Sequence, residues 1–246
     1  MRAIAIIGYK DSGKTVLAER MIPILKAKNM KVAVVKHVHE EISLPEKDSG
    51  RLFRAGADLV LTVSKGVIEE YRRYDAKLWE IISSLKSYDF AIFEGFKSEF
   101  PGVRIAVAKD AEEAKQLVSP LTIAIVSTRE KIDGENFKIP VFDLDRDLEK
   151  IVDYVLKKAF EPLPALNCGF CKYGNCMSMA EAILRGEATH RDCTVLSSKV
   201  KLRVDGRSIE LNPFVQDVFR NVVYALVSTL KGAPTNPSSV ELKVER

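Results

Sequence analysis

The sequence predicts an α/β fold in which a mostly parallel sheet is built around a phosphate-binding loop and is followed by a cysteine-rich module and an α+β tail. Three observations lead to this fold class. Short apolar runs alternate with segments of helical periodicity over residues 1–160, residues 8–15 read GYKDSGKT, and all four cysteines lie within residues 168–193. Alternating strands and helices are typical of a parallel sheet covered by helices. We therefore expect three units, at residues 1–160, 161–197 and 198–246.

The phosphate-binding loop is the most specific of these signals. Residues 8–15 match the pattern G-x-x-x-x-G-K-[ST] at every fixed position. The apolar run 3–7 precedes the loop and helical periodicity over 16–25 follows it, so the loop joins a buried strand to a helix. Backbone N–H groups of such a loop bind phosphate oxygens, and the helix N-terminus adds partial positive charge. We expect the phosphate contacts to come from Gly8, Lys10, Asp11, Ser12, Gly13, Lys14 and Thr15.

Two side chains are candidate Mg²⁺ ligands. The Thr15 hydroxyl follows the loop lysine, and Glu94 ends the apolar run 90–94. Parallel strands bring their carboxyl ends to one edge of a sheet, where proteins with this loop hold Mg²⁺. An ordinary strand-end acid is the alternative for Glu94. Residues 126–129 close a later strand where a base-recognition loop could lie, but no Asn-Lys-x-Asp guanine signature is present. The residues alone therefore leave GTP and ATP open.

A polar stretch follows the second apolar run, 31–36, and contains His37, His39 and Asp48. It has little periodicity, so we predict a loop. The second strand of such a sheet ends beside the first, and we expect these three side chains to lie near the phosphate site. A zinc site and a plain solvated loop are the alternatives.

The remaining segments predict further strands and helices. In the first unit we expect helices at 51–57, 78–85 and 148–160, and strands at 59–64, 67–71, 104–108, 121–126 and 141–143. In the tail we expect a hairpin at 199–211 with an Asp-Gly turn, a helix from Pro213 and a third strand at 240–244. The tail helix is apolar on more than one face, which predicts burial against the hairpin or a partner chain.

The cysteines indicate a metal site. Their spacing is Cys168-x2-Cys171-x4-Cys176-x16-Cys193, with a helix expected between the last two. Four thiolates that converge after one short helix can hold zinc or a [4Fe–4S] cluster. Paired C-x-x-C knuckles, which are typical of zinc ribbons, are missing from the sequence. A disulfide pair is a further alternative, but clustered cysteines in a cytosolic protein more often bind metal.

Residues 167–176, together with Ala180–Ile183 and Gly186, resemble the four-cysteine [4Fe–4S] module of corrinoid iron–sulfur proteins. Spacing and resemblance together favour the cluster over zinc, so the second unit is expected to be a small iron–sulfur module.

Five stretches follow one another in an order that resembles a known family. They are residues 8–15, 36–39, 47–49, 54–57 and 93–97. The chain resembles the molybdopterin-guanine dinucleotide biosynthesis protein B (MobB) family over roughly residues 1–160. The resemblance implies a P-loop fold and a GTP-binding adapter that assists attachment of a guanine nucleotide to molybdopterin or its tungsten equivalent. It also implies weak GTP hydrolysis, a separate nucleotidyltransferase as partner, and contact with the pterin cofactor or its acceptor enzyme.

Composition limits the alternatives. The net charge of +4 is modest and spread along 246 residues, which does not favour nucleic acid, and no run of about 18 apolar residues predicts a membrane span. Met1 leads directly into the first strand, so we expect a cytoplasmic protein. We separately expect a homodimer. Two other functions remain open: a nucleotide-driven iron–sulfur electron-transfer or metallocentre-maturation ATPase, and a binding scaffold whose nucleotide only sets its conformation.

Overall fold

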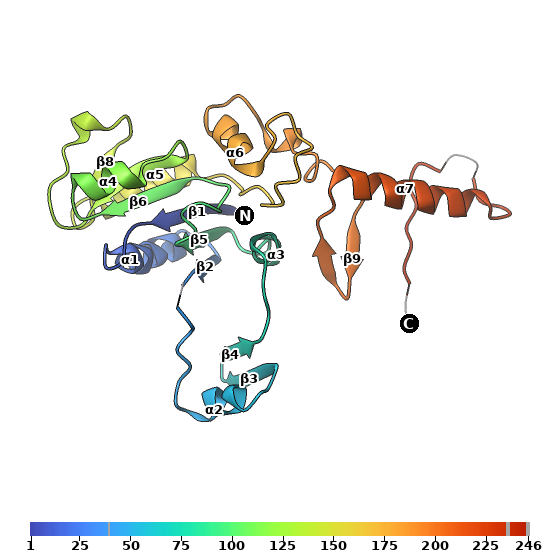
Figure 1. Cartoon of the computed structure of the whole chain (residues 1–246), viewed down its shortest axis with the longest axis horizontal. Coiled ribbons are helices and arrows are strands. Elements are labelled where there is room, and N and C mark those ends of the chain that lie inside the picture. The colour runs from blue at the N-terminus through green and yellow to red at the C-terminus, as the bar shows by residue number, and fades with distance from the viewer. Residues whose placement is uncertain (39, 235–236, 245–246) are drawn as a thin grey trace.

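The computed structural model of the chain describes residues 1–38, 40–234 and 237–244. Six parallel strands form one sheet in the order β2-β5-β1-β6-β7-β8 (Figure 1). The elements of this part of the chain are β1 (Arg2–Ile7), α1 (Lys14–Ala27), β2 (Val32–Lys36), α2 (Asp48–Arg54), β3 (Leu59–Ser64), β4 (Val67–Arg72), α3 (Leu78–Ser84), β5 (Phe90–Glu94), β6 (Arg104–Ala108), α4 (Ala111–Leu117), β7 (Thr122–Ser127), β8 (Val141–Asp143) and α5 (Leu148–Lys158).

The register of the parallel strands brings the ends of β1, β2 and β5 side by side. Ile6 of β1 lies opposite Glu94 of β5 and Ile105 of β6, and Lys36 of β2 lies opposite Glu94 on its other side. The carboxyl ends of β1, β2 and β5 therefore meet at one edge. The predicted α/β fold with its parallel sheet is confirmed.

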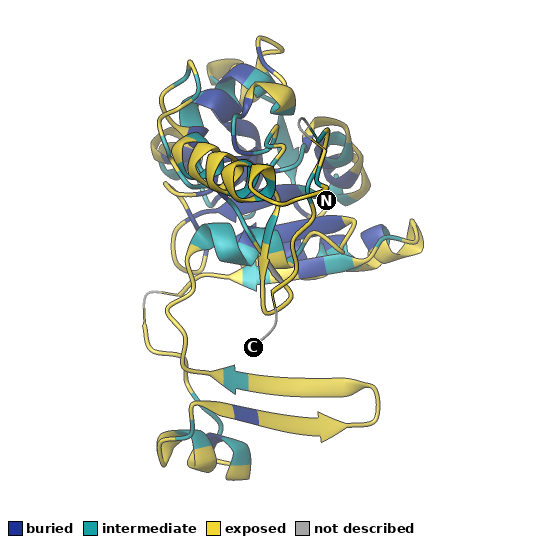
Figure 2. Ribbon diagram, turned by 90° about the vertical axis from the view of Figure 1, so that its right-hand side faces the viewer, coloured by how far each residue is buried: buried dark blue, intermediate teal, exposed yellow. Residues whose placement is uncertain are grey.

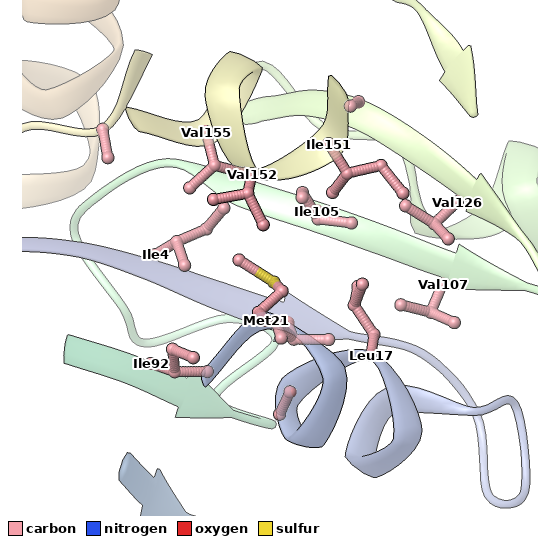
Figure 3. Packing of buried hydrophobic residues seen from close by; sticks show 14 of the residues in the cluster. Ile4, Leu17, Met21, Ile92, Ile105, Val107, Val126, Ile151, Val152 and Val155 are labelled. Atoms are coloured by element: carbon pink, nitrogen blue, oxygen red, sulfur yellow. The ribbon is translucent and has the colours of Figure 1, made fainter. Parts of the chain in front are cut away.

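Helices cover both faces of the sheet because β1, β5, β6 and β7 are buried and apolar on both sides. On one face, α1 and α5 pack over β1 and its neighbours (Figure 3). The side chains that meet there include Ile4, Leu17, Met21, Ile92, Ile105, Val107, Val126, Ile151, Val152 and Val155. On the other face, α3 and α4 pack through Ile82, Ala114 and Leu117. The sequence did not predict α4.

An arm formed by α2, β3 and β4 projects away from the sheet (Figure 1). The structure confirms both predicted strands, but they pair only with each other, as an antiparallel hairpin. Most of this hairpin is exposed (Figure 2). Val60 is its one buried residue, because it faces α2, whose Phe53 ring contacts the Tyr71 ring.

After α5 the chain forms a cysteine-rich module and a tail. Their elements are α6 (Cys176–Leu184), β9 (Leu202–Val204), β10 (Arg207–Ile209) and α7 (Pro213–Ser228). α6 packs through Met179 and Ala180 on Leu121, which precedes β7, and on Leu163. The module is therefore attached to the sheet through a small hydrophobic cluster of its own.

The predicted hairpin and helix of the tail are present, but the packing of the helix differs from the prediction. The hairpin forms around Asp205–Gly206, and Asn212 Oδ1 caps α7 by accepting from Val215 N at 3.0 Å. α7 has no buried residue among those described, and Phe214 is 66% exposed, so the predicted burial within this chain is wrong. Apolar periodicity shows that a helix has an apolar face but not what covers it. The predicted strand at 240–244 is also wrong, because these described residues form none.

None of the helices that the structure describes is long and apolar enough to span a bilayer.

Candidate functional site

The phosphate loop leaves the carboxyl end of β1 and ends where α1 begins at Lys14. Both glycines of the pattern have a steric reason to be there. A Cβ on Gly8 would lie 2.4 Å from Ser12 Oγ and 2.6 Å from the Val107 carbonyl oxygen. Gly13 has a φ of 95°, in the left-handed region that strains other residues. The loop can therefore curl tightly over the edge of the sheet.

Thr128, just after β7, holds this loop in place. Its Oγ1 donates a hydrogen bond of 3.0 Å to the Ser12 carbonyl oxygen. Thr128 belongs to residues 126–129, which the sequence offered for base recognition, and in the structure it contacts the phosphate loop. The Ser12 residue is 1% exposed, and its Oγ has no hydrogen-bond partner among the described residues.

Thr15, Lys36 and Glu94 meet where β2 and β5 end beside α1. Thr15 Oγ1 donates to Glu94 Oε1 at 2.8 Å. Lys36 Nζ lies 3.2 Å from the same carboxylate oxygen and donates to Thr15 Oγ1 at 3.3 Å. The Glu94 side chain is only 7% exposed. One hydroxyl and one ammonium therefore hold a nearly buried carboxylate, and the two residues predicted to bind Mg²⁺ lie together.

Positive charge gathers beside this carboxylate. Lys14 Nζ donates a hydrogen bond of 2.6 Å to the Tyr9 carbonyl oxygen. Burial lowers the pKa of Lys14; Glu94 opposes this shift, and the charges of Lys97 and Lys36 add to it. The Lys97 ammonium lies 3.9 Å from the centroid of the Tyr9 ring. Three lysines around one short loop favour a ligand that carries several negative charges.

These side chains line an open groove of about 1060 Å³, which is large enough for a nucleotide-sized ligand. Its walls are formed by residues 8–16, 36–38, 40–43 and 94–99. The groove therefore contains the whole predicted phosphate loop together with Thr15 and Glu94.

The structure places the other predicted loop residues differently. His37 lies in the groove wall, with its ring centroid 5.0 Å from that of Phe96. Asp48 begins α2 in the arm and is not among the residues that line the groove, and His39 lies outside the described residues. Sequence reasoning did not assign Lys36 or Lys97 to the site. Their signal was their position, because Lys36 ends β2 and Lys97 lies in the loop that follows β5.

The four cysteines line one small pocket. Cys168 and Cys171 lie in the loop before α6, Cys176 begins that helix, and Cys193 follows a short 3-10 turn. All four are free thiols. The four predicted ligands therefore line the same pocket, and the disulfide alternative is not supported.

Backbone and amide hydrogen bonds hold the cysteine loop. Asn167 Oδ1 accepts a hydrogen bond from Cys176 N at 3.0 Å. Gly174 N donates to the Cys171 carbonyl oxygen at 3.0 Å, and both Gly169 and Gly174 have a φ of 77°. The left-handed glycines let the chain turn twice around the pocket.

The four thiols are a donor set for either zinc or an iron–sulfur cluster. Burial raises the pKa of the Cys176 and Cys193 thiols, so a bound cation would be needed to favour their thiolates. Tetrahedral zinc, with Zn–S bonds of about 2.3 Å, requires sulfurs about 3.8 Å apart. Among the described residues no three potential ligands converge closely enough for one metal ion. Four thiols that line one pocket match the four-cysteine donor set that holds an iron–sulfur cluster.

Arg104 lies between the groove and the cysteine module. Its guanidinium, in a residue 4% exposed, donates to the Lys97 carbonyl through Nη1 and to the Phe100 carbonyl through Nη2 at 3.0 Å. Nη2 also lies 3.7 Å from the sulfur of Met177, which follows Cys176 in α6. Burial lowers the pKa of Arg104, and the charge of Glu181 opposes that shift. One buried side chain thus contacts both candidate sites.

Comparisons with known proteins agree with both parts of the chain. A family model described as "Molybdopterin guanine dinucleotide synthesis protein B" matches residues 3–128, and one described as "Putative Fe-S cluster" matches residues 163–195. A protein of Methanocaldococcus jannaschii, named "Putative molybdopterin-guanine dinucleotide biosynthesis adapter protein", is 34% identical over 253 residues, which cover 100% of this chain and 98% of that protein.

Shorter relatives match the first part alone. A Bacillus subtilis protein, "Probable molybdopterin-guanine dinucleotide biosynthesis adapter protein", is 31% identical over 164 residues, 63% of this chain and 91% of its own. The crystal structure of Bacillus subtilis MobB superimposes with a TM-score of 0.55 and 26% identity, covering 65% of this chain and 99% of that one. The cysteine module and tail lie beyond the region that these shorter proteins share.

Replacing Arg104 tests its structural role. Arg104→Met leaves the carbonyls of Lys97 and Phe100 without the donor that the buried guanidinium supplies, so the free energy of unfolding should fall by roughly 2–5 kcal/mol. Arg185→Met is the matched control, because Arg185 pairs with Glu181 and Glu187 at the surface and should change stability by less than about 1 kcal/mol. Urea unfolding of both variants measures the difference. Equal losses would contradict the role assigned to Arg104.

Proposed function

The chain belongs to the molybdopterin guanine dinucleotide synthesis protein B family, and on this premise we propose that it is a GTP-binding adapter in guanine dinucleotide cofactor biosynthesis. The pterin would carry molybdenum or tungsten. The observation that carries the proposal is the groove, in which Lys14, Lys36 and Lys97 surround the phosphate loop beside Thr15 and Glu94. A separate nucleotidyltransferase would perform the transfer, and the pterin cofactor or its acceptor enzyme would be the other partner.

In this proposal the loop residues Gly8 to Thr15 bind the phosphates through their backbone N–H groups, and Lys14 pairs with the outer phosphates. The unpartnered Ser12 hydroxyl supplies a further donor. Thr15 and Glu94 bind Mg²⁺. These two residues would hold the ion, which would supply charge neutralisation at the phosphates. The Lys36 ammonium contacts the same two oxygens and would pair with phosphate when the ion is bound. Hydrolysis is proposed to be weak.

Lys14→Ala should weaken nucleotide binding by roughly ten- to a hundredfold, because a charge-assisted contact contributes about 1.5–3 kcal/mol. The control is Lys26→Ala, an exposed lysine in the last turn of the same helix, which should bind like the wild type. Calorimetric titration of the full chain with Mg²⁺–GTP and Mg²⁺–ATP under anaerobic conditions measures both affinities. Wild-type affinity in Lys14→Ala would refute the phosphate site, and a preference for ATP would refute the guanine assignment.

A second function is favoured by one observation, the contact of Arg104 with both the groove and α6. In it, the chain is a nucleotide-driven electron-transfer or metallocentre-maturation ATPase, and the cluster is its working group. ATP preference together with hydrolysis that depends on cluster reduction would favour this function over the adapter. Binding of either nucleotide without turnover would favour a scaffold.

We also propose that Cys168, Cys171, Cys176 and Cys193 hold a [4Fe–4S] cluster. When bound, the cluster would supply one-electron redox chemistry or a structural crosslink for the module. The cysteine loop has little apolar content of its own, so the fold of residues 163–195 should depend on the metal.

Cys176→Ser should lose most of its iron, because an open iron position makes the cluster labile. Ser178→Ala, two residues further along α6, is the control and should keep its iron. We expect about four irons per wild-type chain and a broad absorption near about 400 nm in anaerobic protein. If the anaerobic protein contains stoichiometric zinc and takes up no iron even after reconstitution, the cluster proposal is wrong and the cysteines form a structural zinc site.

The arm supports the proposed homodimer. One face of its hairpin is covered by α2, while the other exposes Leu59, Leu61, Val63 and Ile68. Because a twofold interface pairs a patch with itself, two such apolar faces can pack on one another.

Val63→Lys should therefore convert a dimer into a monomer. Thr62→Lys, on the opposite face of the same strand, is the matched control and should leave the dimer intact. Sedimentation velocity of the full chain measures the mass. A monomeric wild-type chain at tens of micromolar would end the homodimer proposal.

A further inference from the structure

One hydroxyl group in the cysteine module has no hydrogen-bond partner. Thr194 follows Cys193 directly and lines the pocket that the four cysteines share. Its Oγ1 is buried and forms no hydrogen bond with any described residue. Buried hydroxyl groups are nearly always paired in native proteins, and an unpaired one lowers stability. This atom therefore needs an acceptor that the described residues do not provide.

Other hydroxyl groups of the same segment are paired within the protein. Ser197 Oγ donates to the Cys193 carbonyl oxygen at 2.8 Å, Ser198 Oγ donates to the Val200 carbonyl oxygen at 2.8 Å, and Thr189 Oγ1 donates to Asp192 at 3.1 Å. The segment thus satisfies its polar groups wherever a protein acceptor is near. Thr194 shares its pocket with the sulfur atoms of Cys168, Cys171, Cys176 and Cys193, which can accept a hydrogen bond.

We propose that the Thr194 hydroxyl donates a hydrogen bond to a sulfur atom of the [4Fe–4S] cluster and raises its reduction potential. The inference rests on the proposed cluster. A reduced cluster carries one more negative charge than the oxidised form, so a donor stabilises the reduced form more strongly. Hydrogen bonds to the sulfurs are one of the means by which proteins set cluster potentials. Thr194 is a tuning residue, not a ligand.

The tail helix α7 contacts the backbone of Thr194. Gln216 Nε2, in the first turn of α7, donates to the Thr194 carbonyl oxygen at 3.3 Å and to the Leu211 carbonyl oxygen at 2.7 Å. The backbone that carries the hydroxyl is therefore fixed by an element outside the module. This contact gives the tail an influence on the cluster without any ligand of its own.

The test uses the full chain, purified without air, as wild type, Thr194→Val, Thr194→Ala and Thr194→Ser. Valine has nearly the shape of threonine but no hydroxyl group, and serine keeps the hydroxyl group. Ser198→Ala is the control, because it removes a hydroxyl group that already has a protein acceptor. A redox titration followed by electron paramagnetic resonance of the reduced cluster measures the midpoint potential, and iron analysis measures occupancy.

We expect unchanged iron in every variant, a more negative potential in Thr194→Val and Thr194→Ala, and potentials near wild type in Thr194→Ser and Ser198→Ala. Loss of iron from both hydroxyl-free variants but not from Thr194→Ser would also support the hydrogen bond. The same potential in the wild type and in Thr194→Val would overturn it, as would an equal shift in Thr194→Ser. A wild-type chain that never takes up iron fails the proposed cluster itself.

Discussion

Parallel pairing around β1 fixes where the charged groups of the groove lie. The register places Ile6 opposite Glu94, and Glu94 opposite Lys36, so an acid and a lysine are brought to the same edge as the loop that follows Ile7. Lys36 and Glu94 are the last residues of their strands, so both lie directly at the groove. Since a parallel sheet is buried on both faces, its strand ends are the places where polar side chains can meet water and ligand.

The segment between β5 and β6 serves two regions at once. It begins at Glu94 and Lys97 in the groove, and its carbonyl groups at Lys97 and Phe100 accept from Arg104. Leu163 N, at the start of the cysteine module, donates to the Pro101 carbonyl oxygen at 3.1 Å. The same short segment therefore supplies Lys97 to the groove wall and the Pro101 carbonyl to the cysteine module.

Local patterns predicted most of the sheet domain and the loop. The phosphate loop, the strand that ends at Glu94 and the cysteine loop are each encoded within about ten residues, so their types could be assigned from the sequence. The places of Lys36 and Lys97 beside Lys14 depend on strand register, which links residues far apart in the chain. The packing of α7 could not be predicted in this way: its apolar residues indicated a buried helix, yet none of its described residues is buried.

The arm can open locally while the rest of the protein stays folded. Among the described residues β3 and β4 pair with no other strand, and Val60 is their one buried side chain. The free energy that keeps them paired is therefore local, and the hairpin can open while β1 and β5 stay paired. Residues 40–43 of the groove wall belong to the chain that leads to this hairpin. A ligand that orders the wall therefore also loses binding free energy to the conformational entropy of the arm. A partner that already holds the arm would remove this loss and so raise the affinity for the ligand.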